Sequence, residues 1–170
     1  IMCITKEVSL SVFLTCTISC IYLYQRNNIN DRWIAILFGY IGIMQLLEYF
    51  MWKDQDCKGL NQKATKISIY FILLQPIVSF VVAYIMTNGK IPNWLYMINI
   101  IYVIYAMPIL YSKLEDNQCT KPCNGSDFGL NWAWTDIDIG KRNIRGTFVW
   151  FVFFLALISP LLLMKKNENI

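Results

Sequence analysis

The chain has 170 residues, a formal net charge of +4 and no histidine, and 56% of its residues are hydrophobic. The absence of histidine excludes histidine-ligated metal sites, a histidine general base and Ser-His-Asp catalysis. The apolar residues gather in blocks long enough to cross a hydrocarbon core of about 30 Å, which predicts an integral membrane protein. No basic patch has the spacing expected for nucleic-acid binding.

Five apolar stretches are predicted to cross the membrane, and each is expected to be helical because lipid offers no partner for backbone groups. They cover residues 8–24, 33–52, 67–87, 94–111 and 147–164. The predicted fold is therefore all-α, a single integral membrane domain over residues 1–170 forming a polytopic transmembrane helix bundle. For the first stretch a cleaved signal peptide is the alternative, although Glu7 offsets Lys6 and no clear cleavage site follows the apolar run.

The connections fall on two sides of the predicted membrane. The N-terminus, residues 53–66 and a long extramembrane loop over residues 112–146 share one side, and the short turns and the C-terminus share the other. Ten lysines and arginines against five favour the long-loop side as cytoplasmic, whereas Arg26 and Arg32 after the first span favour the reverse. A glycosylation sequon at Asn124 and the loop cysteines decide for an extracytosolic or lumenal long loop and a cytoplasmic C-terminus.

Six cysteines divide into two groups. Cys16 and Cys20 lie four residues apart inside the first span, where small side chains typically pack at a helix contact. The remaining four fall on the long-loop side and are candidates for disulfides: Cys3, Cys57, Cys119 and Cys123. Free thiols and a four-thiolate zinc site are the alternatives, and the C-x3-C spacing with two isolated cysteines disfavours zinc. Four cysteines allow three pairings, which the sequence leaves open.

Polar residues interrupt the second and third spans. Gln45 and Glu48 are three residues apart and share a helix face, which Tyr49 extends. Gln75 precedes Pro76, a residue that frees a carbonyl and bends the helix. Counting depth at about 1.5 Å per residue places these side chains near one level, in the half of the membrane that faces the cysteine loops. The candidate ligand-binding residues are therefore Gln45, Glu48, Tyr49 and Gln75.

The bundle-facing polar residues have a second interpretation, as interhelical hydrogen bonds that hold the helices together. In the long loop, Trp132 and Trp134 are predicted to form a lid that lies in the membrane interface. No cofactor and no metal are predicted.

Several motifs occur in a distinctive order: Cys3 before T-x-E-x-S, RW before a span ending in Gln45 and Glu48, then DQDC, NQKAT, Gln75-Pro76, and a loop with two cysteines and W-x-W. The set resembles an uncharacterised family of small polytopic membrane proteins from bacteria, algae and large DNA viruses. The resemblance implies a seven-span bundle with cysteines in the N-terminus and one extramembrane loop, and no activity. This chain has five predicted spans and lacks the histidines of that family, so it either lacks the last two spans or is a fragment.

The favoured function is a bundle that binds or transports a small ligand or cation in a polar pocket on spans two and three. The alternative is a structural or assembly membrane protein, for example of a virus, whose polar residues only hold helices together. An enzyme is disfavoured because few catalytic groups are present. The expected partners are the lipid bilayer and further copies of the chain, since five spans are few for a transporter.

Overall fold

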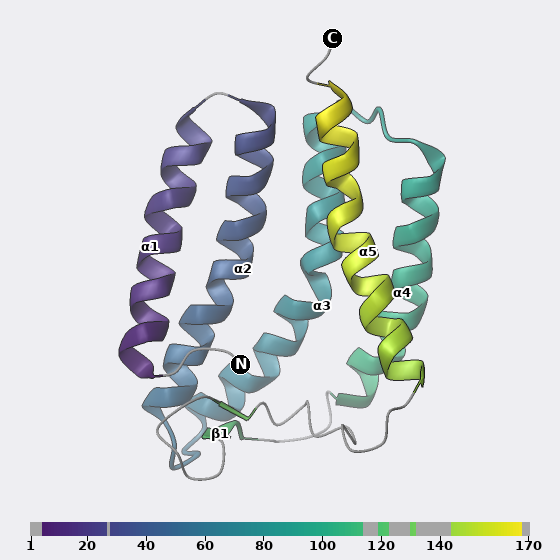
Figure 1. Ribbon diagram of the computed structural model, residues 1–170. Helices are drawn as coiled ribbons and strands as arrows, with labels where there is room; N and C mark the ends of the chain where they lie inside the picture. The colour runs from purple at the N-terminus through teal and green to yellow at the C-terminus, as the bar shows by residue number, and fades with distance from the viewer. Residues whose placement is uncertain (1–4, 27, 114–118, 123–129, 132–143, 168–170) are drawn as a thin grey trace.

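The computed structural model describes residues 5–26, 28–113, 119–122, 130–131 and 144–167. These residues form five helices and one short pair of antiparallel strands (Figure 1). The elements are α1 (Lys6–Gln25), α2 (Ile29–Lys53), α3 (Leu60–Met86), α4 (Asn93–Lys113), β1 (Lys121–Pro122), β2 (Leu130–Asn131) and α5 (Ile144–Asn167). The predicted all-helical class is confirmed.

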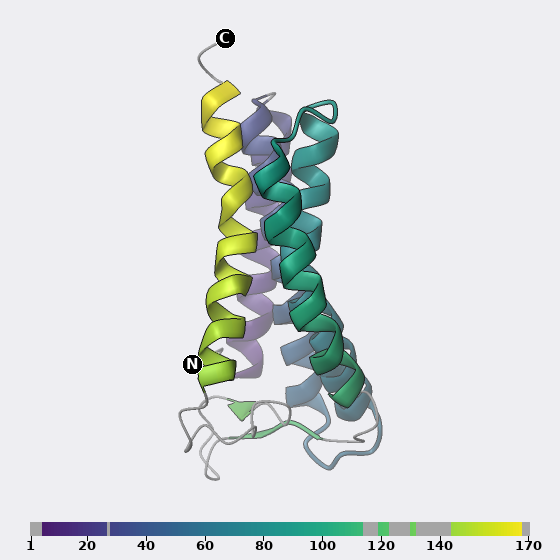
Figure 2. The same cartoon turned by 90° about the vertical axis from the view of Figure 1, so that its right-hand side faces the viewer.

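The helices run roughly along one axis in both views (Figure 1 and Figure 2). The start of α1, the α2–α3 connection and the β1–β2 pair lie at one end, which we call the cap end; the α1–α2 and α3–α4 turns and the end of α5 lie at the other. This is the grouping predicted from the sequence. Along the bundle, α1 packs on α2, α2 on α3, and α3 contacts both α4 and α5.

Three of the helices, α1, α2 and α3, are long and apolar enough to cross a membrane. The described apolar stretches of α4 and α5 cover residues 93–106 and 150–162 and are shorter. Large apolar side chains also face outward on every helix, with Ile18 68%, Ile85 66% and Leu162 66% exposed. Such outward apolar faces suit contact with lipid, so the structure indicates a membrane protein; the count of five spans stays a prediction.

The core near the cap end joins α2, α3, α4 and α5. Its buried side chains include Met44, Leu47, Met51, Ile72, Tyr102, Val152, Phe153 and Ala156. A second cluster at the opposite end centres on Trp33, which is 1% exposed and whose indole Nε1 donates to the Ser79 carbonyl oxygen at 3.1 Å. Burial of these apolar groups fixes the order of the helices.

Pro76 and Pro160 lie inside helices and free backbone carbonyls, and hydroxyl groups donate to carbonyl oxygens near both prolines. Pro76 lies within α3, which bends partway along its length (Figure 1). The Tyr102 hydroxyl of α4 donates to the nearby Leu73 carbonyl at 2.6 Å. This hydrogen bond joins the bend in α3 to α4.

The same arrangement recurs at Pro160 in α5. This proline cannot donate to the carbonyl of Ala156, which instead accepts from the Ser159 hydroxyl at 3.1 Å. The adjacent Leu157 carbonyl accepts from the Ser79 hydroxyl of α3 at 2.9 Å. Each proline-bearing segment therefore supplies a backbone acceptor that a neighbouring helix uses.

We expect Tyr102→Phe to lower the free energy of unfolding by about 1 kcal/mol, because the Leu73 carbonyl then lacks its hydroxyl donor in a buried position. Unfolding in mixed detergent micelles measures the difference. Tyr105→Phe is the matched control, since Tyr105 lies on the exposed side of the same helix. Equal losses for the two variants would contradict this role for the Tyr102 hydroxyl.

Candidate functional site

A row of polar side chains follows one side of α3 and faces the inside of the bundle. All of them are buried, and they recur at intervals of three, four and seven residues, which is one helix face. We call this row the polar face of α3; it consists of Asn61, Thr65, Ser68, Gln75 and Ser79. Of these five residues, only Gln75 was predicted from the sequence to belong to a site. The spacing of the other four along one helix face would have indicated that they are buried together.

Asn61 lies at the centre of a hydrogen-bond network at the cap end. Its amide Nδ2 donates to the carbonyl of Met51 at 3.0 Å and to that of Thr120 at 2.8 Å, and its Oδ1 accepts from the Thr120 backbone N–H at 3.0 Å. The Thr65 hydroxyl donates to Asn61 Oδ1 at 3.1 Å and lies 2.8 Å from the Thr120 hydroxyl. One buried side chain thus joins the end of α2, the start of α3 and the segment that contains β1.

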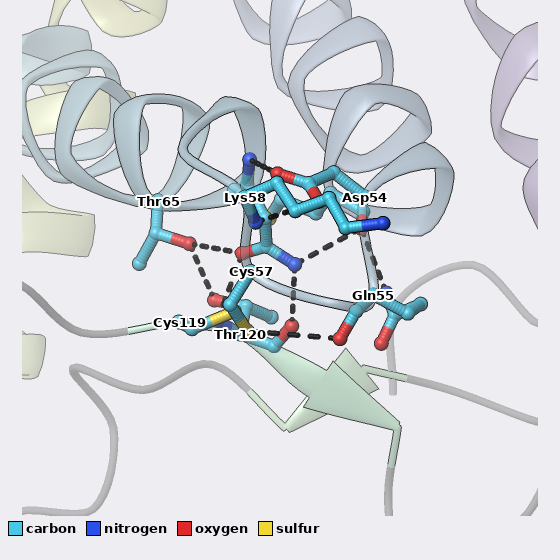
Figure 3. Close-up of a disulfide and its surroundings, with 9 residues drawn as sticks. Asp54, Gln55, Cys57, Lys58, Thr65, Cys119 and Thr120 are labelled. Atoms are coloured by element: carbon cyan, nitrogen blue, oxygen red, sulfur yellow. Dashed lines mark hydrogen bonds between the residues drawn. A yellow bond between two sulfur atoms is a disulfide. The ribbon is translucent and has the colours of Figure 1, made fainter.

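A disulfide links the same elements covalently. Cys57, in the α2–α3 connection, is bonded to Cys119, the residue before Thr120, with a Cα–Cα distance of 6.1 Å (Figure 3). The bond closes a sequence separation of 62 residues. Among the pairings that the sequence left open, the structure contains this one. Cys3 and Cys123 lie outside the described residues.

The start of α3 is fixed by a carboxylate from the end of α2. Gly59 precedes the helix and has no side chain to cap it, but Asp54 Oδ1 accepts from the Lys58 N–H at 2.9 Å and Oδ2 from the Asn61 N–H at 3.0 Å. These backbone hydrogen bonds hold the pKa of Asp54 below its usual value. The cap explains why α3 begins at Leu60, seven residues before the predicted span.

Glu48 is completely buried on α2, a helix that packs against both α1 and α3. Its level follows from two contacts between α2 and α3: the Tyr40 ring stacks on Phe71 at 5.0 Å, and the Met51 carbonyl accepts from Asn61. Glu48 therefore lies opposite residues 63–64 of α3, next to Thr65 and about one helical turn from Ser68. Ser9 of α1, also completely buried, belongs to the same end of the bundle.

Gln75 does not lie level with Glu48. Trp33 bonds to Ser79 and Tyr40 stacks on Phe71, so Gln75 faces the stretch of α2 between residues 33 and 40. This places it roughly 17 Å further along the bundle, at about 1.5 Å per residue. The expectation of a shared level fails because α3 starts early and its first turns occupy the positions opposite Glu48.

Gln75 lies instead at the height along the bundle where α3 contacts α4. Tyr102 bonds to Leu73, and the Phe80 and Tyr96 rings meet at 5.2 Å, so the buried Asn99 lies close to the level of Pro76. Asn99 donates to the Leu95 carbonyl at 3.0 Å.

The other predicted site residues have separate places. Gln45 and Tyr49 are half-buried on α2, and the Lys6 ammonium lies 6.0 Å from the centroid of the Tyr49 ring. Trp132, Trp134 and the sequon residue Asn124 lie outside the described residues. Within the described part of the chain, no three cysteine, aspartate or glutamate side chains gather as metal ligands.

Comparison with models of known protein families, with curated proteins and with solved structures found no match. The resemblance drawn from the ordered motifs therefore stays a prediction.

We expect the cap on α3 to make the stability of the protein depend on pH. Because the pKa of Asp54 is lower in the folded state than in the unfolded state, its contribution is present at neutral pH and is lost as the pH falls below about 4, through the folded pKa. Unfolding in detergent should show Asp54→Asn less stable than the native chain at pH 7, with the difference shrinking toward pH 3.

Asp56→Asn is the matched control, because Asp56 pairs with Lys58 at 2.9 Å on an exposed surface and should change stability little at either pH. A constant difference between Asp54→Asn and the native chain from pH 7 to pH 3 would rule out the capping role.

Proposed function

We propose that the protein is a membrane-embedded helix bundle that binds a small cation at Glu48. The observation that carries the proposal is the complete burial of this carboxylate within α2, a helix long and apolar enough to cross a membrane. Ionisable side chains inside membrane spans are costly and commonly mark ion or substrate sites. The five predicted spans belong to this proposal, and a homo-oligomer would supply the larger bundle that transport requires.

The surroundings of Glu48 suit a small hard cation. Thr65 and Ser68 are buried on the opposite stretch of α3, and Ser9 is buried on α1 at the same end. The Ser9 hydroxyl donates to the Thr5 carbonyl at 3.1 Å and the Ser68 hydroxyl to the Thr65 carbonyl at 2.6 Å. A hydroxyl that donates its proton still carries oxygen lone pairs, so these groups can act as ligands beside the carboxylate.

The proposed cation site uses part of the set of ligand-binding residues predicted from the sequence. Glu48 is the proposed centre, with Gln45 one turn away on the same face and Tyr49 toward α1. Gln75 belongs to a separate level near the bend in α3. The lid role of Trp132 and Trp134 stays a prediction.

The disulfide supports the orientation that we propose for the bundle. A bond between Cys57 and Cys119 forms and persists in an oxidising compartment. The cap end then faces the lumen or the outside of the cell, and the C-terminus faces the cytoplasm. A ligand would reach Glu48 from the extracytosolic side.

The second candidate function is a structural or assembly role. It is favoured by the network around Asn61, in which buried polar groups of three segments bond to one another. In that case the polar face only holds the helices together, and the disulfide-linked cap is the surface that meets a partner.

A charge-neutral substitution separates the two functions. We expect the purified chain in nanodiscs to melt at a higher temperature in the presence of one small cation among H⁺, Li⁺, Na⁺ and K⁺, since a ligand at about 100 times its Kd stabilises by about 2.7 kcal/mol. Glu48→Gln should fold, as judged by circular dichroism and size-exclusion chromatography, and should lose this shift.

Glu7→Gln is the control, because Glu7 is exposed at the start of α1. A native chain whose melting temperature responds to none of the four cations, or a Glu48→Gln variant that responds as the native chain does, would reject the cation site and leave the structural role.

A further inference from the structure

Two thiols meet on the side of α1 that faces α2. Cys16 and Cys20 are one helical turn apart, both are half-buried, and their Sγ atoms lie 3.9 Å from each other. Neither belongs to the disulfide at the cap end, and both are separate from Glu48. They pack against α2 as the sequence predicted, and their arrangement also brings two sulfur ligands together.

Glycines on α2 leave room for both sulfur atoms. A Cβ placed on Gly42 would lie 3.0 Å from Cys16 Sγ, and one placed on Gly39 would lie 3.9 Å from Cys20 Sγ. The Cys16 thiol lies 3.4 Å from the Phe38 carbonyl oxygen, to which it donates. The two sulfurs therefore face a hollow of α2 backbone that is free of side chains at these positions.

An open groove continues from Cys20 toward the α1–α2 turn. It has a volume of about 280 Å³ and is lined by Cys20, Ile21, Tyr24, Gln25, Ala35 and Ile36. Gln25 is the last residue of α1, so the groove connects one thiol with the end of the bundle opposite the cap. The groove leaves the Cys20 side of the pair open toward that end of the bundle.

The two sulfur atoms are close enough to share one metal ion. A two-coordinate Cu(I) ion binds its thiolates on opposite sides, with the sulfur atoms roughly 4.4 Å apart. The observed separation of 3.9 Å reaches that value after a small rotation about the cysteine χ1 angles. A disulfide would need Cβ atoms about 3.8 Å apart, closer than residues four apart on a continuous helix place them.

We propose that Cys16 and Cys20 bind one soft, thiophilic cation, Cu(I). Thiolate ligands select Cu(I) among the common metals, and Cu(I) is stable with few ligands. Zinc normally takes four ligands, and the described residues gather no third cysteine, aspartate or glutamate at the pair. Binding replaces two S–H protons by one Cu(I) and releases both protons to solvent, with no change of oxidation state.

The test compares Cu(I) binding by four full-length proteins in detergent: the native chain, Cys16→Ser/Cys20→Ser, Cys20→Ser, and Ile18→Cys/Cys20→Ser. Cu(I) is supplied anaerobically as its acetonitrile complex and competed with a chromogenic Cu(I) chelator. The last variant keeps the number of thiols but places them two residues apart, on different sides of α1. Cys3, Cys123 and the disulfide cysteines are the same in all four.

We expect the native chain to hold one equivalent of Cu(I) more than each variant, and X-ray absorption to show sulfur as the nearest neighbour of the copper. Equal stoichiometry in the native chain and Cys16→Ser/Cys20→Ser would overturn the site and leave the thiols as packing groups. Retention of the extra equivalent by Ile18→Cys/Cys20→Ser would also overturn it, because the geometry of the pair would then be irrelevant.

Discussion

A polar side chain inside a membrane helix must find its partner within the protein, and this constraint organises the whole bundle around α3. Lipid supplies no hydrogen bonds, and three of the buried polar residues on α3, Asn61, Thr65 and Ser79, bond to other elements. Asn61 binds the end of α2 and the segment at Thr120, and Ser79 binds α5. The bend at Pro76 provides a further contact of this kind, because Tyr102 of α4 donates a hydrogen bond to a carbonyl beside it. The helix with the most buried polar groups is therefore also the helix that every neighbour except α1 contacts.

At the cap end, two further interactions act beside these hydrogen bonds. Asp54 fixes where α3 begins, and the Cys57–Cys119 disulfide holds the β1 segment against that point. Together they set the register in which α3 passes α2, and that register decides which residues lie opposite Glu48. The proposed cation site thus depends on contacts that lie outside the apolar part of the helix.

The sequence predicted the helical class, the approximate positions of the helices and the grouping of connections at two ends, because hydrophobic block length reports these directly. It could not place Gln75, since the polar stretch after Gly59 read as a loop and the cap by Asp54 depends on a contact between two elements. The pairing of Cys57 with Cys119 could not be predicted from the sequence either, because four cysteines allow three connectivities. Asn61 was missed for the same reason as the start of α3.

Specific side-chain hydrogen bonds dock the cap segment on the polar face of α3. A double-mutant cycle on the Thr65 and Thr120 hydroxyls, which lie 2.8 Å apart, tests this central claim most directly. Thr65→Val, Thr120→Val and the combined variant would be unfolded in detergent with the disulfide intact. We expect a coupling free energy of about 1 kcal/mol, so that the second substitution costs less once the first is made. Strict additivity of the two losses would contradict the docking of the cap on α3.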